Sequence, residues 1–245
     1  MIRVFADAED LARGAAAFLA ERIRAAVAVR GRASLLLAGG ETPRRTYERL
    51  AEEPFRGAIP WDKIHFFWGD ERCVSADDPL SNQRMARASL LDRVPVPPEN
   101  IHALTCAESP EQAAATYQRE LQDHFIVDPP RFDLVLLGLG ADGHTASLFP
   151  GAAALAEPTR WTAVVQRPGD AFHRITLTLP LLNRGRVILF LVTGEAKAAV
   201  LAEIFRGEGP HPARQVYPDH GELLWYIDRD AATRLRFPPE TSEVR

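Results

Sequence analysis

Short apolar runs alternate along this chain with segments of helical periodicity, and this alternation restricts the possible fold more than any other feature. Five runs have the length and composition of buried strands: residues 34–37, 64–68, 132–137, 187–192 and 223–227. Amphipathic helical spacing occupies other segments, most clearly residues 9–30, 110–125 and 194–205. Strands that alternate with helices need crossover connections, which favour a mainly parallel sheet. We therefore expect an α/β fold, with a mainly parallel, doubly wound sheet and helices on both of its faces.

Weaker patterns complete the expected order of elements. A helix is expected from about Pro43, with Thr42 as its N-cap, because proline is favoured in the first helical turn. An acidic turn is expected after Trp68, followed by a helix near residues 81–92. Residues 174–179 alternate in polarity, which predicts a strand with one solvated face.

Composition narrows the class of protein. With 46% apolar residues, 25% charged residues and a net charge of −4, the chain has the profile of a soluble globular protein without a general attraction for nucleic acid. It shows no signal core and no apolar run near the ~20 residues of a membrane span, so a cytoplasmic protein without a membrane partner is expected.

Cys73 and Cys106 make neither a disulfide framework nor a zinc site, and Cys73 is expected to be a buried small hydrophobe. No linker divides the chain, so residues 1–245 should form one domain with a loose tail at 238–245.

Ligands of open α/β sheets bind beyond the carboxyl ends of the strands, which makes the segment after the run 132–137 a first candidate site. This segment reads GLGADGHTASLFP, and its three glycines match the G-x-G-x-x-G spacing of a dinucleotide-binding turn. A dinucleotide site also needs a long helix after the third glycine, whereas Pro150 leaves room for barely two turns. The glycines are better explained by a tight turn that lets a ligand approach the backbone.

His144 follows the last of those glycines and is the strongest candidate for a catalytic residue. An imidazole is suited to general-base work near neutral pH, and here it coincides with a strand end, a glycine turn and the neighbouring Asp142. Asp142 either orients the imidazole or caps the short helix expected after the turn, and the sequence favours neither role. The other histidines are expected to be structural or exposed to solvent: His65, His102, His124, His173, His211 and His220.

Other strand ends carry groups suited to an anion the size of a phosphate. The flexible turn Gly39-Gly40 leads into a helix N-terminus, which offers backbone N–H groups to an anion. Lys197 is one of only two lysines and is expected in the first turn of a helix, where a cation opposes the helix dipole unless an anion is usually bound. The candidates for this basic pocket are Gly39, Gly40, Arg72, Arg174 and Lys197. A carboxylate at Glu41 would repel a phosphate, so its side chain should point away from the site.

Several motifs occur in matching order and together resemble the 6-phosphogluconolactonase family: LAGGETP, IHFFWGDERCV with the later SNQRMA, GLGADGHTASLFPG, RITLTLPLLN and TGEAKA. The resemblance implies a glucosamine-6-phosphate deaminase-like fold. It also implies hydrolysis of 6-phospho-D-glucono-1,5-lactone to 6-phosphogluconate, in the pentose phosphate pathway and without a metal or cofactor. One departure is Glu41, because the family turn commonly reads GG-S-TP; this puts a hydroxyl contact in doubt and leaves the backbone contacts possible.

The resemblance also implies roles for individual residues. His144 would be the general base, and Asp142 would orient it or act as a cap. The substrate-binding set would be Gly39, Gly40, Thr42, Asp70, Arg72, Arg174 and Lys197. Within that set, Arg174, Lys197 and the glycine turn would hold the phosphate. Asp70 would accept a hydrogen bond from a sugar hydroxyl, unless it only forms a local ion pair with Arg72.

Two alternative functions share this architecture. A deaminase or isomerase acting on an amino-sugar phosphate needs an additional carboxylate, but the residues directly after His144 are TASLF. A non-catalytic sugar-phosphate sensor, such as the effector domain of a transcription regulator, is disfavoured because no DNA-binding helix pair precedes the α/β region. The expected partner is therefore a small sugar-phosphate lactone, and the expected assembly is a monomer or a weak homo-oligomer.

Overall fold

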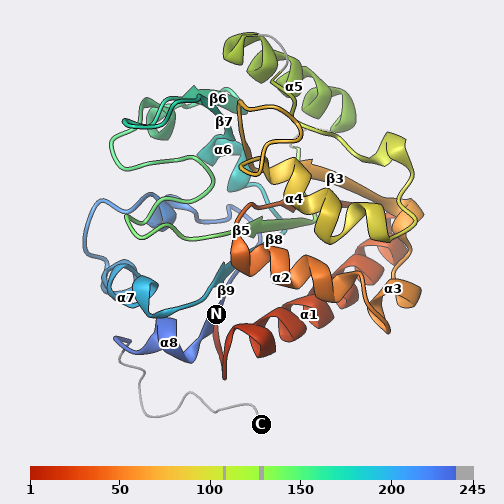
Figure 1. Ribbon diagram of the computed structural model, residues 1–245, viewed down its shortest axis with the longest axis horizontal. Helices are drawn as coiled ribbons and strands as arrows, with labels where there is room; N and C mark the ends of the chain where they lie inside the picture. The colour runs from red at the N-terminus through yellow and green to blue at the C-terminus, as the bar shows by residue number, and fades with distance from the viewer. Residues whose placement is uncertain (107–108, 127–129, 236–245) are drawn as a thin grey trace.

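The computed structural model describes residues 1–106, 109–126 and 130–235 and contains the expected parallel sheet (Figure 1). Its six strands are β1 (Ile2–Phe5), β2 (Ala33–Leu37), β3 (Ile64–Trp68), β5 (Leu134–Leu137), β8 (Val187–Val192) and β9 (Glu222–Asp228). They lie in the order β1-β9-β8-β5-β2-β3, and every neighbouring pair is parallel. All residues of β2, β5 and β8 are buried, as expected for strands covered on both faces. The mainly parallel α/β architecture is thus confirmed.

Helices occupy both faces of this sheet. The α-helices are α1 (Ala8–Arg30), α2 (Glu41–Leu50), α3 (Phe55–Ala58), α4 (Asn82–Ser89), α5 (Pro110–His124), α6 (Leu179–Leu182), α7 (Ala198–Arg206) and α8 (Arg229–Ala232). Short 3-10 turns are η1 (Trp61–Lys63), η2 (Leu91–Arg93), η3 (Pro98–Asn100), η4 (Ala153–Ala156), η5 (Glu195–Lys197) and η6 (Pro212–Gln215). The connections β1-α1-β2 and β8-α7-β9 cross the sheet in opposite directions. Because crossovers are right-handed, α1 and α7 lie on opposite faces.

A second, three-stranded sheet was not predicted. It contains β4 (Asp70–Arg72), β7 (Arg174–Leu177) and β6 (Thr162–Val165), paired antiparallel in the order β4-β7-β6. The expected acidic turn after Trp68 is therefore a strand. Gly69 joins the two sheets, since its N–H donates to the Leu37 carbonyl in the large sheet and its carbonyl accepts from Leu177 in the small one, at 2.9 and 2.8 Å.

The prediction that the strand at residues 174–179 has one solvated face is wrong. All four residues of β7 are buried, including Arg174, and the strand ends at Leu177. The strand is buried because it lies between β4 and β6, while α5 packs over β6 and β7. The backbone N–H of Ser147 also donates to the Thr176 hydroxyl of β7, at 3.2 Å.

The expectation for Cys73 is also wrong. Its side chain is only partly buried and forms a disulfide with Cys106, across 33 positions of sequence. Within the described ranges no helix has the length and apolarity that crossing a membrane would require. The tail expected at residues 238–245 lies outside the described residues.

Candidate active site

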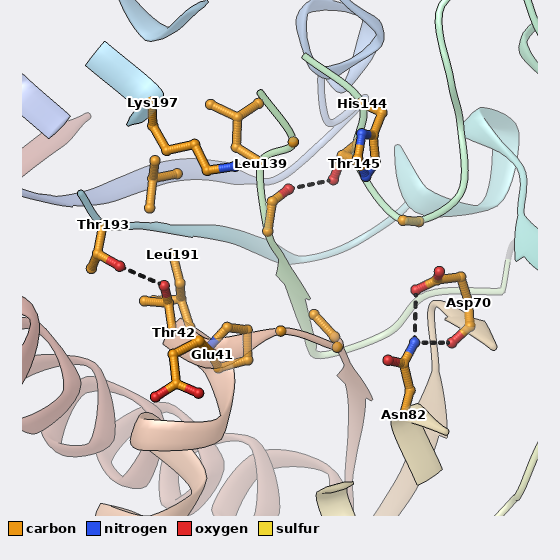
Figure 2. Close-up of a pocket in the computed structure, with 18 of the residues that line it drawn as sticks. Glu41, Thr42, Asp70, Asn82, Leu139, His144, Thr145, Leu191, Thr193 and Lys197 are labelled. Atoms are coloured by element: carbon orange, nitrogen blue, oxygen red, sulfur yellow. Dashed lines mark hydrogen bonds between the residues drawn. The ribbon is translucent and has the colours of Figure 1, made fainter. Parts of the chain in front are cut away.

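A pocket of about 380 Å³ opens where β2, β5 and β8 end, beside the start of β4 and β7 (Figure 2). Eight of the nine predicted site residues line it: Gly39, Gly40, Thr42, Asp70, Arg72, His144, Arg174 and Lys197. Asp142 is the ninth and contacts His144 directly. The rule that ligands bind at the carboxyl ends of parallel strands thus selects segments that do meet in space.

The imidazole of His144 is held by Asp142. Its Nδ1 lies 2.5 Å from Asp142 Oδ1, and the His144 backbone N–H donates to the same oxygen at 3.1 Å. Burial raises the pKa of Asp142, but these hydrogen bonds outweigh burial, so the pKa of the carboxyl lies below its usual value. An ionised Asp142 accepts from Nδ1–H and leaves Nε2 as the nitrogen that can take up a proton.

The conformation of residues 138–150 bears on the two roles expected for Asp142 and on the position of the His144 ring. The expected short helix is absent, because residues 138–150 form turns and an isolated bridge between Thr145 and Leu148. Asp142 therefore has no helix to cap there. A side chain at Gly140 would place its Cβ 2.0 Å from His144 Nδ1, so only glycine lets the ring lie this close to the backbone.

Lys197 lines the pocket and forms no ion pair among the described residues. It lies at the end of η5, directly before α7, rather than inside the first turn of the helix as expected. Figure 2 shows its side chain extending from that turn into the pocket. Partial burial lowers the pKa of Lys197, and the nearby charge of Asp142 opposes this only in part. Burying an ammonium group without a counter-ion is costly, which favours an anionic ligand at this position.

The turn between β2 and α2 presents backbone N–H groups to the same pocket. Gly40, not Thr42, is the N-cap of α2; it has φ of +106° and forms no side-chain capping bond. The Thr42 hydroxyl instead lies 2.7 Å from that of Thr193, which ties the start of α2 to the end of β8 (Figure 2). The Glu41 carboxylate pairs with Arg44 and Arg45, at 2.5 and 3.1 Å. It points away from the Lys197 side, as expected, and leaves the helix N-terminus open to an anion.

Asp70 does not form the expected alternative ion pair with Arg72. It accepts from the Ser147 hydroxyl at 2.5 Å and from the Asn82 amide at 3.3 Å. Arg72 instead donates to the Leu80 carbonyl. Asn82 and Ser147 were not predicted as site residues, although both lie in motifs that carried the family resemblance, SNQRMA and HTASLFP.

The neighbouring Glu71 has a structural role that explains the middle residue of the D-E-R motif. Its carboxylate accepts from the backbone N–H groups of Asn82 and Gln83, at 2.8 and 2.7 Å, and from the Ser81 hydroxyl at 3.1 Å. It therefore satisfies the first N–H groups of α4. Burial raises the pKa of Glu71 against these hydrogen bonds. The motif thus fixes α4, and with it Asn82, beside the pocket.

Arg174 lines the pocket with its charge already paired. Its Nε and Nη2 donate to Asp170 Oδ2 at 2.9 and 2.7 Å. The guanidinium also lies 5.5 Å from the ring centroid of Phe149 and 5.1 Å from that of Phe172. Arg174 therefore has less free charge for an anion than Lys197, a difference that the sequence did not indicate.

Known proteins with similar sequences or solved structures share this architecture. A model of the family of glucosamine-6-phosphate isomerases/6-phosphogluconolactonase matches residues 6–225. A 6-phosphogluconolactonase of Synechocystis sp. is 50% identical over 222 residues, which cover 88% of this chain and 90% of that protein. The crystal structure of 6-phosphogluconolactonase from Thermotoga maritima is similar with a TM-score of 0.77 and 32% identity, covering 94% of this chain and 99% of that chain. A monomeric glucosamine-6-phosphate deaminase shares the fold, with a TM-score of 0.81, 23% identity and coverage of 96% and 99%.

Proposed function

This chain belongs to the glucosamine-6-phosphate isomerase/6-phosphogluconolactonase family, and from that premise we propose that it hydrolyses 6-phospho-D-glucono-1,5-lactone to 6-phosphogluconate in the pentose phosphate pathway. The observation that carries the proposal is one pocket lined by both His144, which Asp142 orients, and Lys197, an ammonium group without a counter-ion. These are the two groups that a phosphorylated cyclic ester needs: a base for water and a cation for phosphate.

The proposed reaction begins with a water molecule at His144. Nε2 takes a proton from the water while the water oxygen bonds to C1 of the lactone, giving a tetrahedral oxyanion. The oxyanion then collapses, the bond between C1 and the ring oxygen breaks, and the imidazolium returns the proton to that oxygen. Asp142 stabilises the imidazolium through Nδ1–H. An ester carbonyl is already electrophilic, so this route needs only an oriented water, a base and hydrogen-bond donors for the oxyanion.

The phosphate is proposed to bind at the other end of the substrate. Lys197 and the N-terminus of α2, beginning at Gly40, offer an ammonium and backbone N–H groups to it. Asp70 and Asn82 also line the pocket and would contact sugar hydroxyls. Phosphate binding far from C1 contributes orientation, because it places the lactone carbonyl against the base.

The direct test uses purified protein and freshly generated 6-phosphogluconolactone. We expect acid release well above the spontaneous rate, measured by pH-stat against a heat-inactivated sample. The same preparation should release no ammonia from glucosamine 6-phosphate, since no carboxylate follows His144 in TASLF. A thermal shift with 6-phosphogluconate but no turnover of the lactone would instead identify a sensor.

A more specific prediction concerns Asp142 as the positioning residue of the base. Asp142→Asn should lower kcat by ~10–150-fold, the equivalent of about 1.5–3 kcal/mol for a hydrogen bond to a charged group, and change KM little. The acid limb of the profile of kcat/KM against pH should also move to lower pH, because a neutral amide stabilises the imidazolium less. A drop in kcat with an unchanged pH profile would contradict the orienting role and indicate a merely structural one.

We propose a monomer or weak homo-oligomer that acts in the cytoplasm on a small sugar phosphate, without nucleic acid or membrane as a partner.

A further inference from the structure

Three histidines that the sequence did not connect meet at the end of the sheet opposite the pocket. His65 is the second residue of β3, whose other end leads to Asp70 in the active site. His102 follows η3, and His124 is the last residue of α5. One ring nitrogen from each lies within 4.8 Å of the other two, and all three side chains are partly exposed.

We propose that His65, His102 and His124 form a binding site for a first-row transition metal ion, with Zn²⁺ as the preferred physiological occupant. Three imidazoles with an open fourth position suit Zn²⁺ and also accept Cu²⁺ or Co²⁺. Zn–N bonds of about 2.0–2.1 Å in a tetrahedron set the ligand nitrogens about 3.3–3.4 Å apart. His65 Nδ1 and His102 Nε2 are already 3.0 Å apart, and a ring nitrogen of His124 lies within the 4.8 Å that spans the three ligand atoms, so the third ring needs to move inward by at most about 1.5 Å.

The groups around the cluster are those that orient metal ligands. Glu120 Oε1 lies 3.0 Å from His102 Nδ1, which leaves Nε2 of that ring facing His65. A carboxylate on the outer nitrogen of a ligating histidine fixes its tautomer and raises its basicity. Glu120 lies one helical turn before His124 on α5. Phe67 stacks on His102 with centroids 4.3 Å apart and planes 2° apart, which holds that ring in place.

The charge state of the three histidines also favours metal binding. Burial lowers the pKa of His65 to about 4 and that of His124 to about 3, with further contributions from the neighbouring rings and Arg32. Both rings are therefore neutral at pH 7, the form that binds metal. Arg32 opposes a cation, as do the other arginines that line a small pocket with His124, namely Arg30, Arg131 and Arg186; Glu120 and Asp133 attract one.

Such a site would stabilise the fold without taking part in hydrolysis. The ligands come from β3, the segment after η3 and the end of α5, so one ion joins three elements that are distant in sequence. Metal bound only by the folded chain raises Tm by mass action. The proposal is independent of the lactonase assignment, because it predicts a metal-dependent Tm and an unchanged kcat.

The test is a Zn²⁺ titration of chelator-treated, full-length protein by calorimetry, with Co²⁺ absorption spectra as a report of coordination. A His144→Ala background removes the imidazole of the active site as a competing ligand. We expect about one tight Zn²⁺ per chain, a rise in Tm, and affinity weakened more than ~100-fold in His124→Ala and ~10–100-fold in Glu120→Gln. His173→Ala is the matched control, because His173 is exposed and lies outside the cluster.

Equal Zn²⁺ affinity in His124→Ala, Glu120→Gln and His173→Ala would overturn the proposal, as would no binding by the unsubstituted chain. Arg32→Gln gives a second, opposite readout, since removing that positive charge should tighten binding of the metal. Glu120→Gln alters a partly exposed side chain and Arg32→Gln an exposed one, so both variants keep the test decisive if a histidine variant fails to fold. Circular dichroism of each variant, and lactone turnover of the same substitutions in a chain that keeps His144, identify such a failure.

Discussion

Replacing His144 by alanine should lower kcat for lactone hydrolysis by ~10²–10⁴-fold, the usual contribution of a general base, while KM stays close to that of the unsubstituted enzyme. The expectation follows from the geometry. Asp142 occupies Nδ1, the ring packs against Phe149 with centroids 4.6 Å apart, and the imidazole lines the pocket. None of the groups assigned to phosphate binding contacts the ring, so its removal should leave substrate affinity intact.

The measurement is initial acid release at saturating lactone, corrected for spontaneous hydrolysis, together with the Kd for 6-phosphogluconate. His173→Ala serves as the control for loss of an exposed imidazole and should keep the full rate. Added imidazole should restore part of the activity of His144→Ala, because the truncation leaves space beside Phe149 for a free ring. A variant that turned over the lactone at the original rate would show that another group, such as Asp70, supplies the base.

Much of the large sheet could be predicted from the sequence, and the reason is burial. The runs that became β2, β3, β5, β8 and β9 are apolar because both faces of the sheet are covered. The small sheet escaped prediction because β4 is only three residues long and reads D-E-R, a composition typical of a turn. Its polar side chains are satisfied by partners distant in sequence, such as Ser147 for Asp70.

The residues of the candidate site were likewise predictable from the sequence only in part. Strand ends selected Gly40, His144 and Lys197, because the topology of a parallel sheet brings those ends to one edge. The sequence could not indicate that Asp170 neutralises Arg174, since that contact depends on how the loop before β7 folds back. Nor could it connect His65 with His124, because 59 positions separate them and no spacing motif links them. Tertiary contacts, not local patterns, decide such pairings.

Replacing Lys197 by alanine should raise KM for 6-phosphogluconolactone by ~10–150-fold, as expected when about 1.5–3 kcal/mol of charge-assisted hydrogen bonding is lost. The effect on kcat should be smaller, because the phosphate lies far from C1 and its contacts are made in the ground state as well. Lys63→Ala is a matched control: it removes the only other lysine, whose exposed side chain pairs with Asp62.

Two further readouts connect the loss to phosphate itself. With glucono-1,5-lactone, which has no phosphate, Lys197→Ala and the unsubstituted enzyme should show the same kcat/KM. The substitution should therefore impair only the hydrolysis of a phosphorylated lactone. Partial burial lowers the pKa of Lys197, so the affinity for 6-phosphogluconate should fall as pH rises through a value below that of an ordinary lysine. Lys197→Arg should abolish that fall, since guanidinium stays protonated. If Lys197→Ala impaired both lactones equally, Lys197 would act on the ring or the oxyanion, and the phosphate would have to bind elsewhere in the pocket.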